Sequence, residues 1–242
     1  MCFPLCTTMN NFKLISLILL LSVCFRIHAQ KSSFNYKTDY QAYLKRSKDS
    51  TSRFYYAKLK SRLDKVDTTL SANDLLYLLI YTTASSHYNP VLLDTLCQHL
   101  YDFNEKGEYF KALALADSIL RVVPINLTAI KEKGLALKKL NKKEDFERYW
   151  ALTRKTAEAL FLSGDGYYKH PFLGVNYFDG ITFYGTFYQC YPSKSGFMLD
   201  KQGRLLAAFY GYSQKMDNII INYFQLDHAK RFYKPNIVEG EE

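Results

Sequence analysis

The sequence is poor in the residues and motifs from which most catalytic and metal sites are built. Its 242 residues include five cysteines, five histidines and one tryptophan. It has no His-Glu-x-x-His, no Gly-x-Ser-x-Gly, no glycine-rich phosphate loop and no calcium loop with alternating acids. Sequence support is therefore lacking for zinc proteases, serine hydrolases, P-loop nucleotide-binding proteins and EF-hand proteins. The sequence predicts no cofactor and no metal site.

The cysteines and histidines that are present do not form a recognisable catalytic pair. Cys97 has His99 two residues away, and on a helix this offset points the two side chains apart. Cys190 could combine with His170 or His228 as nucleophile and base, but only if the fold brings them together. A hydrolase with its site in the C-terminal region therefore stays open as an alternative, with its catalytic residues unknown.

Residues 1–29 contain a secretory signal peptide, whose true start we place at Met9. A short polar segment precedes an apolar run over Leu14–Phe25, and Ala29 supplies the small residue for cleavage. The run is shorter than the roughly 20 residues of a membrane span. A lipid anchor at Cys24 is an alternative, although the valine before this cysteine disfavours it. We expect an exported protein of the periplasm or cell surface.

Removal of this leader changes the charge and the cysteine count. It takes away Lys13 and Arg26 and no acid, which leaves 30 basic minus 23 acidic residues, or +7. Nucleic acid is not expected as the partner of an exported chain. The two remaining cysteines, Cys97 and Cys190, could pair in an oxidising compartment, and two separate thiols are the alternative.

The stretch from Lys106 to Tyr149 has the small residues and the proline of a tetratricopeptide helix pair. Ala112, Pro124 and Gly134 stand where the repeat has a small residue, a helix-ending proline and a second small residue. Pro124 cannot continue a helix and therefore separates the two helices. An ordinary antiparallel helix pair is the alternative, because the aromatic positions of the repeat are not filled. A tetratricopeptide hairpin presents a groove to a partner, so this stretch predicts binding of a protein or peptide.

Lysines recur along the same helix pair. Lys131, Lys138 and Lys142 are interleaved with acids, which is typical of a solvated helix face. The second interpretation is a patch for an acidic partner or an anionic lipid surface. We take these three lysines as the candidate partner-binding residues.

Residues 30–162 are predicted to form a tetratricopeptide-like helical region. Apolar side chains recur at helical spacing in four further segments, 36–44, 54–63, 75–79 and 93–101. Ser71 with Asp74 three residues later is typical of a helix N-terminal cap. These helices are enough to stack on the helix pair.

The C-terminal region, residues 163–242, begins at a pair of glycines that flank Asp165. Asp165 is the acid we would test first for catalysis, although its glycines fit the end of a helix and a turn equally well. Aromatic and β-branched residues follow, and they predict strands over Val175–Phe178, Ile181–Tyr188, Phe197–Leu199, Leu205–Tyr210 and Ile219–Leu226.

The residues from Asp200 to Gly203 have the composition of a hairpin turn between two of these strands. We expect a small, aromatic-rich antiparallel sheet packed against the helices, because so few strands are marginal alone. The fold class is then α+β. Aromatic side chains exposed on such a sheet could stack on a glycan, which is a further alternative.

Four segments together carry a resemblance to a known family. They are FYYAKLKSRLDKVDTTLS at 54–71, Tyr88–Pro90, the helix pair at 107–140 and the Ser163–Gly166 stretch. They resemble a domain-of-unknown-function family of exported proteins from Bacteroidota, over roughly residues 45–170. The family has no assigned activity, so the resemblance implies export and a tetratricopeptide-like helical body and implies nothing about chemistry. The sequence thus predicts a protein-binding module of the cell envelope, with its partner and oligomeric state unknown.

Overall fold

The computed structural model describes residues 34–214, 216–233 and 237–239, which belong to one compact unit. The first part is helical, with α2 (Tyr36–Lys48), α3 (Tyr56–Asp64), α4 (Ala72–Thr83), α5 (Pro90–Glu105), α6 (Tyr109–Val122), α7 (Leu127–Lys139) and α8 (Lys143–Ser163). The predicted signal peptide and the lipid-anchor alternative at Cys24 lie outside the described residues. Within them, no helix is both long enough and apolar enough to cross a membrane.

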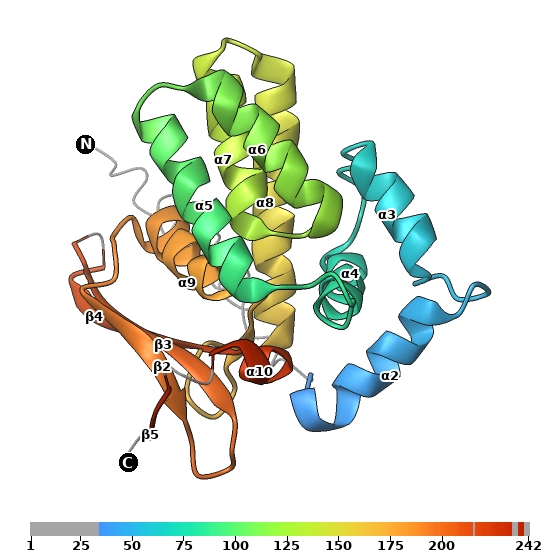
Figure 1. Cartoon of the computed structure of the whole chain (residues 1–242), viewed down its shortest axis with the longest axis vertical. Coiled ribbons are helices and arrows are strands. Elements are labelled where there is room, and N and C mark those ends of the chain that lie inside the picture. Colours follow the sequence, from blue (N-terminus) through green and yellow to red (C-terminus); the bar gives the residue numbers. More distant parts are fainter. Residues whose placement is uncertain (1–33, 215, 234–236, 240–242) are drawn as a thin grey trace, which may run out of the picture. The chain divides into compact units, whose positions relative to one another are not determined.

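The second part combines strands with short helices. Its elements are β1 (Phe172–Leu173), α9 (Tyr177–Phe183), the π-helix η2 (Tyr184–Tyr188), β2 (Lys194–Leu199), β3 (Leu205–Ser213), β4 (Asn218–Gln225), η3 (Asp227–Ala229), α10 (Lys230–Tyr233) and β5 (Ile237–Glu239). The helices and the sheet occupy separate regions, with α9 beside α5 (Figure 1). The α+β class is confirmed. The predicted division after residue 162 falls at the end of α8, although the two parts share one hydrophobic core.

Helix α4 is the central helix of the first part. Its apolar residues are buried nearly all round because α2, α3 and α8 pack against it. The predicted cap is present: Ser71 Oγ accepts the Asp74 N–H, and the Asp74 carboxylate accepts the Ser71 N–H at 3.0 Å. Ser71 and Asp74 therefore satisfy backbone N–H groups at the start of α4 that have no partner within the helix.

Helices α6, α7 and α8 pack as consecutive antiparallel neighbours. Pro124 lies between α6 and α7, and Ala112 and Gly134 are buried. A Cβ atom at Gly134 would lie 3.3 Å from Tyr149 Cβ, so α7 and α8 approach closely at this point. The predicted helix pair is confirmed, and its assignment as a tetratricopeptide repeat stays a prediction.

The sheet has the strand order β1-β4-β3-β2-β5. Its central pairs, β2–β3 and β3–β4, are antiparallel, whereas β1 runs parallel to β4 and β5 parallel to β2. The sheet is therefore mixed, and the antiparallel prediction is correct only for its centre. Tight turns such as Asp200–Gly203 give antiparallel neighbours, while the edge strands are reached through longer connections that contain helices.

The strands predicted over Val175–Phe178 and Ile181–Tyr188 are wrong, because this stretch forms α9 and η2. The helix begins after Asn176, and the carboxylate of Asp179 accepts the Val175 N–H at 2.9 Å. Two pairs of the aromatic residues that suggested strands, Phe183 with Phe187 and Tyr184 with Tyr188, stand four positions apart, and the rings of each pair are in contact. The ring centroids of Phe183 and Phe187 are 4.8 Å apart.

Helix α9 covers one face of the sheet through an aromatic core. The Phe183 ring centroid lies 5.1 Å from that of Phe172 and 5.8 Å from that of Phe224, and all three side chains are fully buried. Phe209 of β3 completes the cluster, 5.5 Å from Phe224. Edge-to-face and tilted contacts of this kind stabilise beyond the area they bury.

Gly180 allows α9 to lie close to β3. A Cβ atom there would sit 2.2 Å from a ring carbon of the buried Phe209, so Gly180→Ala forces repacking. We expect a loss of about 1–3 kcal/mol in the free energy of unfolding. Gly185→Ala is the matched control, because its Cβ would meet nothing within 4 Å. Urea unfolding that gives both variants equal stability would contradict this packing.

Candidate functional site

The chain covers part of its own helical surface. Helix α9 contacts both α5 and α7, so the face that these two helices share is occupied by residues 175–191, which we name the docked segment (Figure 1). A partner groove along this face would therefore be filled already. The docked segment is held by polar contacts, and a cleft lies at one end of it.

Asp94 on α5 is the main polar anchor of the docked segment. Its Oδ1 accepts the Phe178 N–H at 2.9 Å and the Asn176 side-chain amide at 2.7 Å. Its Oδ2 accepts the Tyr233 hydroxyl of α10 at 2.6 Å. Burial raises the pKa of the Asp94 carboxyl, and these hydrogen bonds oppose the rise. One carboxylate therefore fixes α9 and α10 to α5.

A second anchor joins the start of α7 to the docked segment. The Asn126 amide donates to Asn176 Oδ1 at 3.2 Å, and Asn126 Oδ1 accepts the Ala129 N–H at 2.7 Å. Thr128 and Thr182 share a buried hydroxyl contact of 2.6 Å. Asn126 thus caps its own helix, and the side chain of Asn176 links the start of α9 to both α5 and α7.

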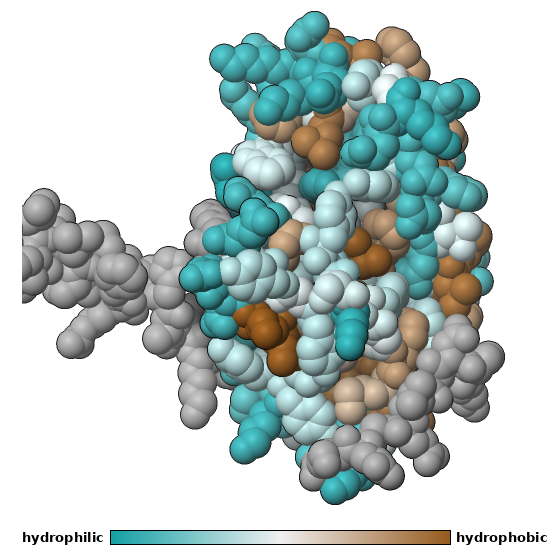
Figure 2. Space-filling model, turned by 90° about the vertical axis from the view of Figure 1, so that its left-hand side faces the viewer, coloured by the Kyte–Doolittle hydropathy of each residue, from teal (hydrophilic) through white to brown (hydrophobic). Residues whose placement is uncertain are grey.

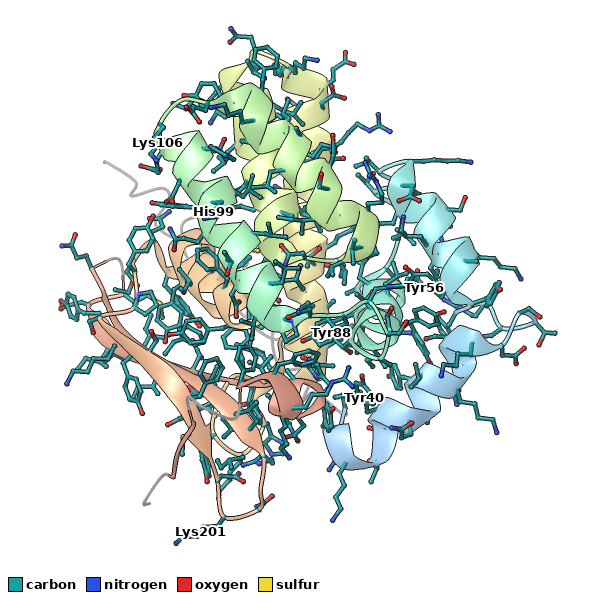
Figure 3. All side chains as sticks on the ribbon, viewed as in Figure 1. Tyr40, Tyr56, Tyr88, His99, Lys106 and Lys201 are labelled. Atoms are coloured by element: carbon teal, nitrogen blue, oxygen red, sulfur yellow. The ribbon has the colours of Figure 1, made fainter. Side chains whose placement is uncertain are left out.

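Tyr88, just before the start of α5, adds another hydrogen bond to the docked segment. Its hydroxyl donates to the Val175 carbonyl, and its side chain lies between the helical body and α10 (Figure 3). The same hydroxyl is fully buried, which raises its pKa well above the ordinary value. Tyr88 therefore acts as a neutral hydrogen-bond donor.

The buried acids and the thiol in this network favour a structural role. Burial raises the pKa of Asp179 to about 7, and the Asp94 charge adds to the shift. Cys97 is fully buried and donates to Asn126 Oδ1 at 3.5 Å. Burial, with Asp179 and Asp94 nearby, raises the pKa of its thiol, so the reactive thiolate is disfavoured. His99 is exposed on α5, as the predicted divergence from Cys97 requires (Figure 3).

A cleft of about 420 Å³ lies between α5, α7 and the docked segment. Its apolar wall includes Phe178 and Ile181, and its polar lining is formed by Gln98, Tyr101, Lys131, Glu132, Thr182, Gln189 and Cys190. Tyr191 also lines it, and the Tyr101 and Tyr191 hydroxyls lie 2.6 Å apart. The cleft therefore combines residues from α5, α7 and the docked segment.

A buried charge pair forms one side of this cleft. Lys131 Nζ lies 2.5 Å from Glu132 Oε1, and the two side chains are 18% and 2% exposed. Glu132 Oε2 accepts the Asn104 amide at 2.7 Å. A charge this deeply buried requires a partner, and the pairing supplies one. Lys131 is thus a wall of the cleft and is not part of an open basic face.

The other side of the cleft has an unusual backbone. The π-helix η2 ends at Tyr188 and is followed by Gln189, a non-glycine residue in the left-handed region with φ of 55°. π-Helices and non-glycine residues in the left-handed region are both rare, and both are found often at functional sites. Gly185 lies in η2, and no atom lies within 4 Å of the position that its Cβ would take. The space above this glycine is open to the cleft that it lines.

The other two candidate lysines lie apart from the cleft. Lys138 is about 10 Å from Lys131 along the axis of α7, and its ammonium lies 5.1 Å from the Phe146 ring centroid. Lys142 is exposed at the N-cap of α8. Only Lys131 of the three therefore lines the cleft with groups that could contact a ligand.

The remaining predicted residues are not brought together. Asp165 is exposed in a turn, where its carboxylate accepts the Tyr167 N–H at 2.9 Å. His228 is partly exposed, but both of its ring nitrogens are buried, and this burial lowers its pKa to about 4, whereas His170 is exposed. Among the described residues Cys190 makes no hydrogen bond to a histidine, and no three His, Cys, Asp or Glu side chains are placed to hold a metal ion.

Both described cysteines are free thiols, so the disulfide between Cys97 and Cys190 is not formed. Burial raises the pKa of the Cys190 thiol, which does not favour a nucleophile. Sequence reasoning missed Asp94, Tyr101 and Asn176. A local signal existed for Asn176 alone, since an asparagine three residues before an acid is typical of a helix start.

Asp179 predicts a dependence of stability on pH. Its pKa rises from 3.8 to about 7 on folding, so the folded protein holds the proton more tightly, and stability falls as pH rises between these values. Asp179→Asn retains an acceptor for the Val175 N–H and cannot ionise. Relative to wild type, we expect this variant to gain roughly 2–3 kcal/mol between pH 5 and pH 8 in urea unfolding. A stability difference that is constant across this range would contradict the buried position of the carboxyl.

Comparison with known proteins identifies one family. The family described as Domain of unknown function (DUF4919) matches residues 42–173. The match runs from α2 to β1 and ends just before the docked segment. No curated protein and no solved structure matches the chain. Because the match covers more than half of its residues, the chain belongs to the domain-of-unknown-function family DUF4919.

Proposed function

We propose that the protein is an exported binding protein of the cell envelope, whose cleft between α5, α7 and the docked segment receives the carboxyl end of a peptide. The observation that carries the proposal is the Lys131–Glu132 pair in the wall of that cleft. The cleft has a volume of about 420 Å³, which lies in the range of small-ligand sites.

The polar groups of the cleft suit a peptide. Lys131 has three N–H donors, and Glu132 takes one of them, which leaves two for another acceptor such as a carboxylate. The amides of Gln98 and Gln189 offer both donors and acceptors to a peptide backbone. Phe178 and Ile181 supply an apolar wall for a side chain. A free peptide carboxylate beside Lys131 would form a charge-assisted hydrogen bond.

The helical body has a supporting role in this proposal. The antiparallel packing of α5 to α8 favours a tetratricopeptide-like scaffold for a partner protein. The docked segment covers the face shared by α5 and α7. The partner therefore inserts the carboxyl end of its chain into the cleft and does not lie along an open groove. Lys138 and Lys142 remain exposed for an additional contact with an acidic partner surface.

The location in the envelope rests on the amino-acid pattern of residues 1–29. The polar start, the apolar run and Ala29 support export through a cleaved signal peptide. N-terminal sequencing of the protein from its native envelope should then begin at Gln30. A first residue within the apolar run would contradict cleavage at this point.

Glycan binding is a second candidate, favoured by the outer face of the sheet. Tyr210 is paired with Ile221 and Tyr212 with Ile219, and all four side chains are exposed. Figure 2 shows that hydrophobic patches on one side of the molecule lie apart from each other among hydrophilic residues. Exposed tyrosines of this kind can stack on a sugar ring.

The test is the binding of short peptide libraries, with a free or an amidated carboxyl end, to the purified protein. We expect free-ended peptides to bind and amidated ones to bind weakly. Gly185→Leu should fill the cleft, and Lys131→Gln should remove the charge, so each should weaken binding by about tenfold or more. Thermal unfolding checks that both variants are folded.

The matched control is Lys138→Gln with Lys142→Gln, which removes two lysines outside the cleft. This double variant should bind as wild type does. Binding that is lost in the control and kept in Gly185→Leu would place the peptide on the exposed lysines. No peptide binding to any form, with retention of the protein on polysaccharide, would favour the glycan alternative.

A further inference from the structure

A second and larger cavity shares no lining residue with the cleft. It has a volume of about 760 Å³ and is bordered by the start of α2, the turn before β1, the β2–β3 turn and α10. The β2–β3 turn is marked by Lys201 in Figure 3. Each of these four segments places one basic side chain in the lining: Lys37, Lys169, Arg204 and Lys230.

Two of the four basic side chains are already neutralised. Arg204 Nε lies 2.6 Å from Asp200 Oδ2, and both side chains are largely buried. Lys230 Nζ lies 2.9 Å from Asp227 Oδ1, which also accepts the Leu205 N–H at 2.7 Å. These acids hold the β2–β3 turn and α10 in place around the cavity. The pairs contribute shape to the site and little net charge.

Among the described residues, Lys37 and Lys169 have no such partner. Both are exposed, and neither lies within ion-pair distance of an acid in the described part of the chain. Asp39, the nearby acid of α2, accepts the Asn35 N–H and does not line the cavity. The lining and its paired acids therefore carry four positive and two negative charges, a balance of +2.

The uncharged residues of the lining suit the organic part of a ligand. Phe34, Tyr36, Pro171 and Leu173 give an apolar and aromatic wall, and Gln202 and Gln225 add amide groups. His170 stands beside Lys169 and offers a further hydrogen-bond donor. The volume is far larger than an inorganic anion needs and lies in the range of sites for small organic ligands.

We propose that this cavity binds a phosphorylated organic molecule, with a body of about the size of a monosaccharide. Lys37 and Lys169 supply the charge that holds the phosphate, because two uncompensated ammonium groups match its two negative charges. The aromatic wall and the glutamines contact the body of the ligand. The phosphate could belong to a free sugar phosphate or to the headgroup of a phospholipid, and the two sources share this recognition.

Calorimetric titration of the purified protein with glucose 6-phosphate, glucose and inorganic phosphate tests the proposal. We expect saturable binding of glucose 6-phosphate, weaker binding of phosphate and none of glucose, with the affinity falling as salt rises. Sedimentation with phosphatidylglycerol vesicles, against phosphatidylcholine vesicles, examines the lipid source. Lys37→Gln with Lys169→Gln should weaken binding by tenfold or more.

The matched control is Lys45→Gln with Lys48→Gln, which removes two exposed lysines from the other end of α2. It should bind as wild type does, and thermal unfolding should show all forms folded. Binding to anionic vesicles alone, lost in the first double variant only, supports the site and assigns it to a lipid headgroup. Absence of saturable binding to every phosphate probe, or equal loss in both double variants, overturns the proposal.

Discussion

The carboxylate of Asp94 connects three parts of the chain that are far apart in sequence. It accepts hydrogen bonds from the side-chain amide of Asn176, the backbone of Phe178 and the hydroxyl of Tyr233. Without it, these donors would lose their acceptor inside the protein, which costs more than the net value of the bonds themselves. Asp94 therefore acts with the Asn126–Asn176 and Thr128–Thr182 contacts to fix α9 against the helical body, and it also holds α10. The cleft depends on these contacts in turn, because α9 and η2 form one of its walls.

The helical body could be predicted because its signals are local. The Ser71–Asp74 cap, the proline between α6 and α7 and the small residue at Gly134 act within a few residues of chain. The docked segment could not be predicted in the same way. Its aromatic residues favour strands in isolation, and the contacts that select a helix come from Asp94, about 80 residues earlier. Long-range contacts thus overrode local propensity at this point.

The candidate site was predicted in part, and the reasons are again physical. Lys131 was selected for its charge, but the sequence does not show that Glu132 pairs with it or that Tyr101 and Tyr191 meet across the cleft. Those contacts exist only because the docked segment returns to the helices. The basic cavity has the same origin, since its lysines come from residues 37 and 169 and meet only in the folded chain. The cleft therefore belongs to the junction of α5, α7 and the docked segment, and the basic cavity to the junction of α2 and α10 with the sheet.

The central claim is that residues 175–191 are docked on α5 and α7 through Asp94. Hydrogen–deuterium exchange read at the amides of Val175 and Phe178 tests it most directly, because both amides are bonded to carboxylates in the buried network. We expect slow exchange at both amides in the wild type and much faster exchange in Asp94→Ala, with the amides of α4 unchanged. Fast exchange of these two amides in the wild type, while α5 and α7 stay protected, would contradict it.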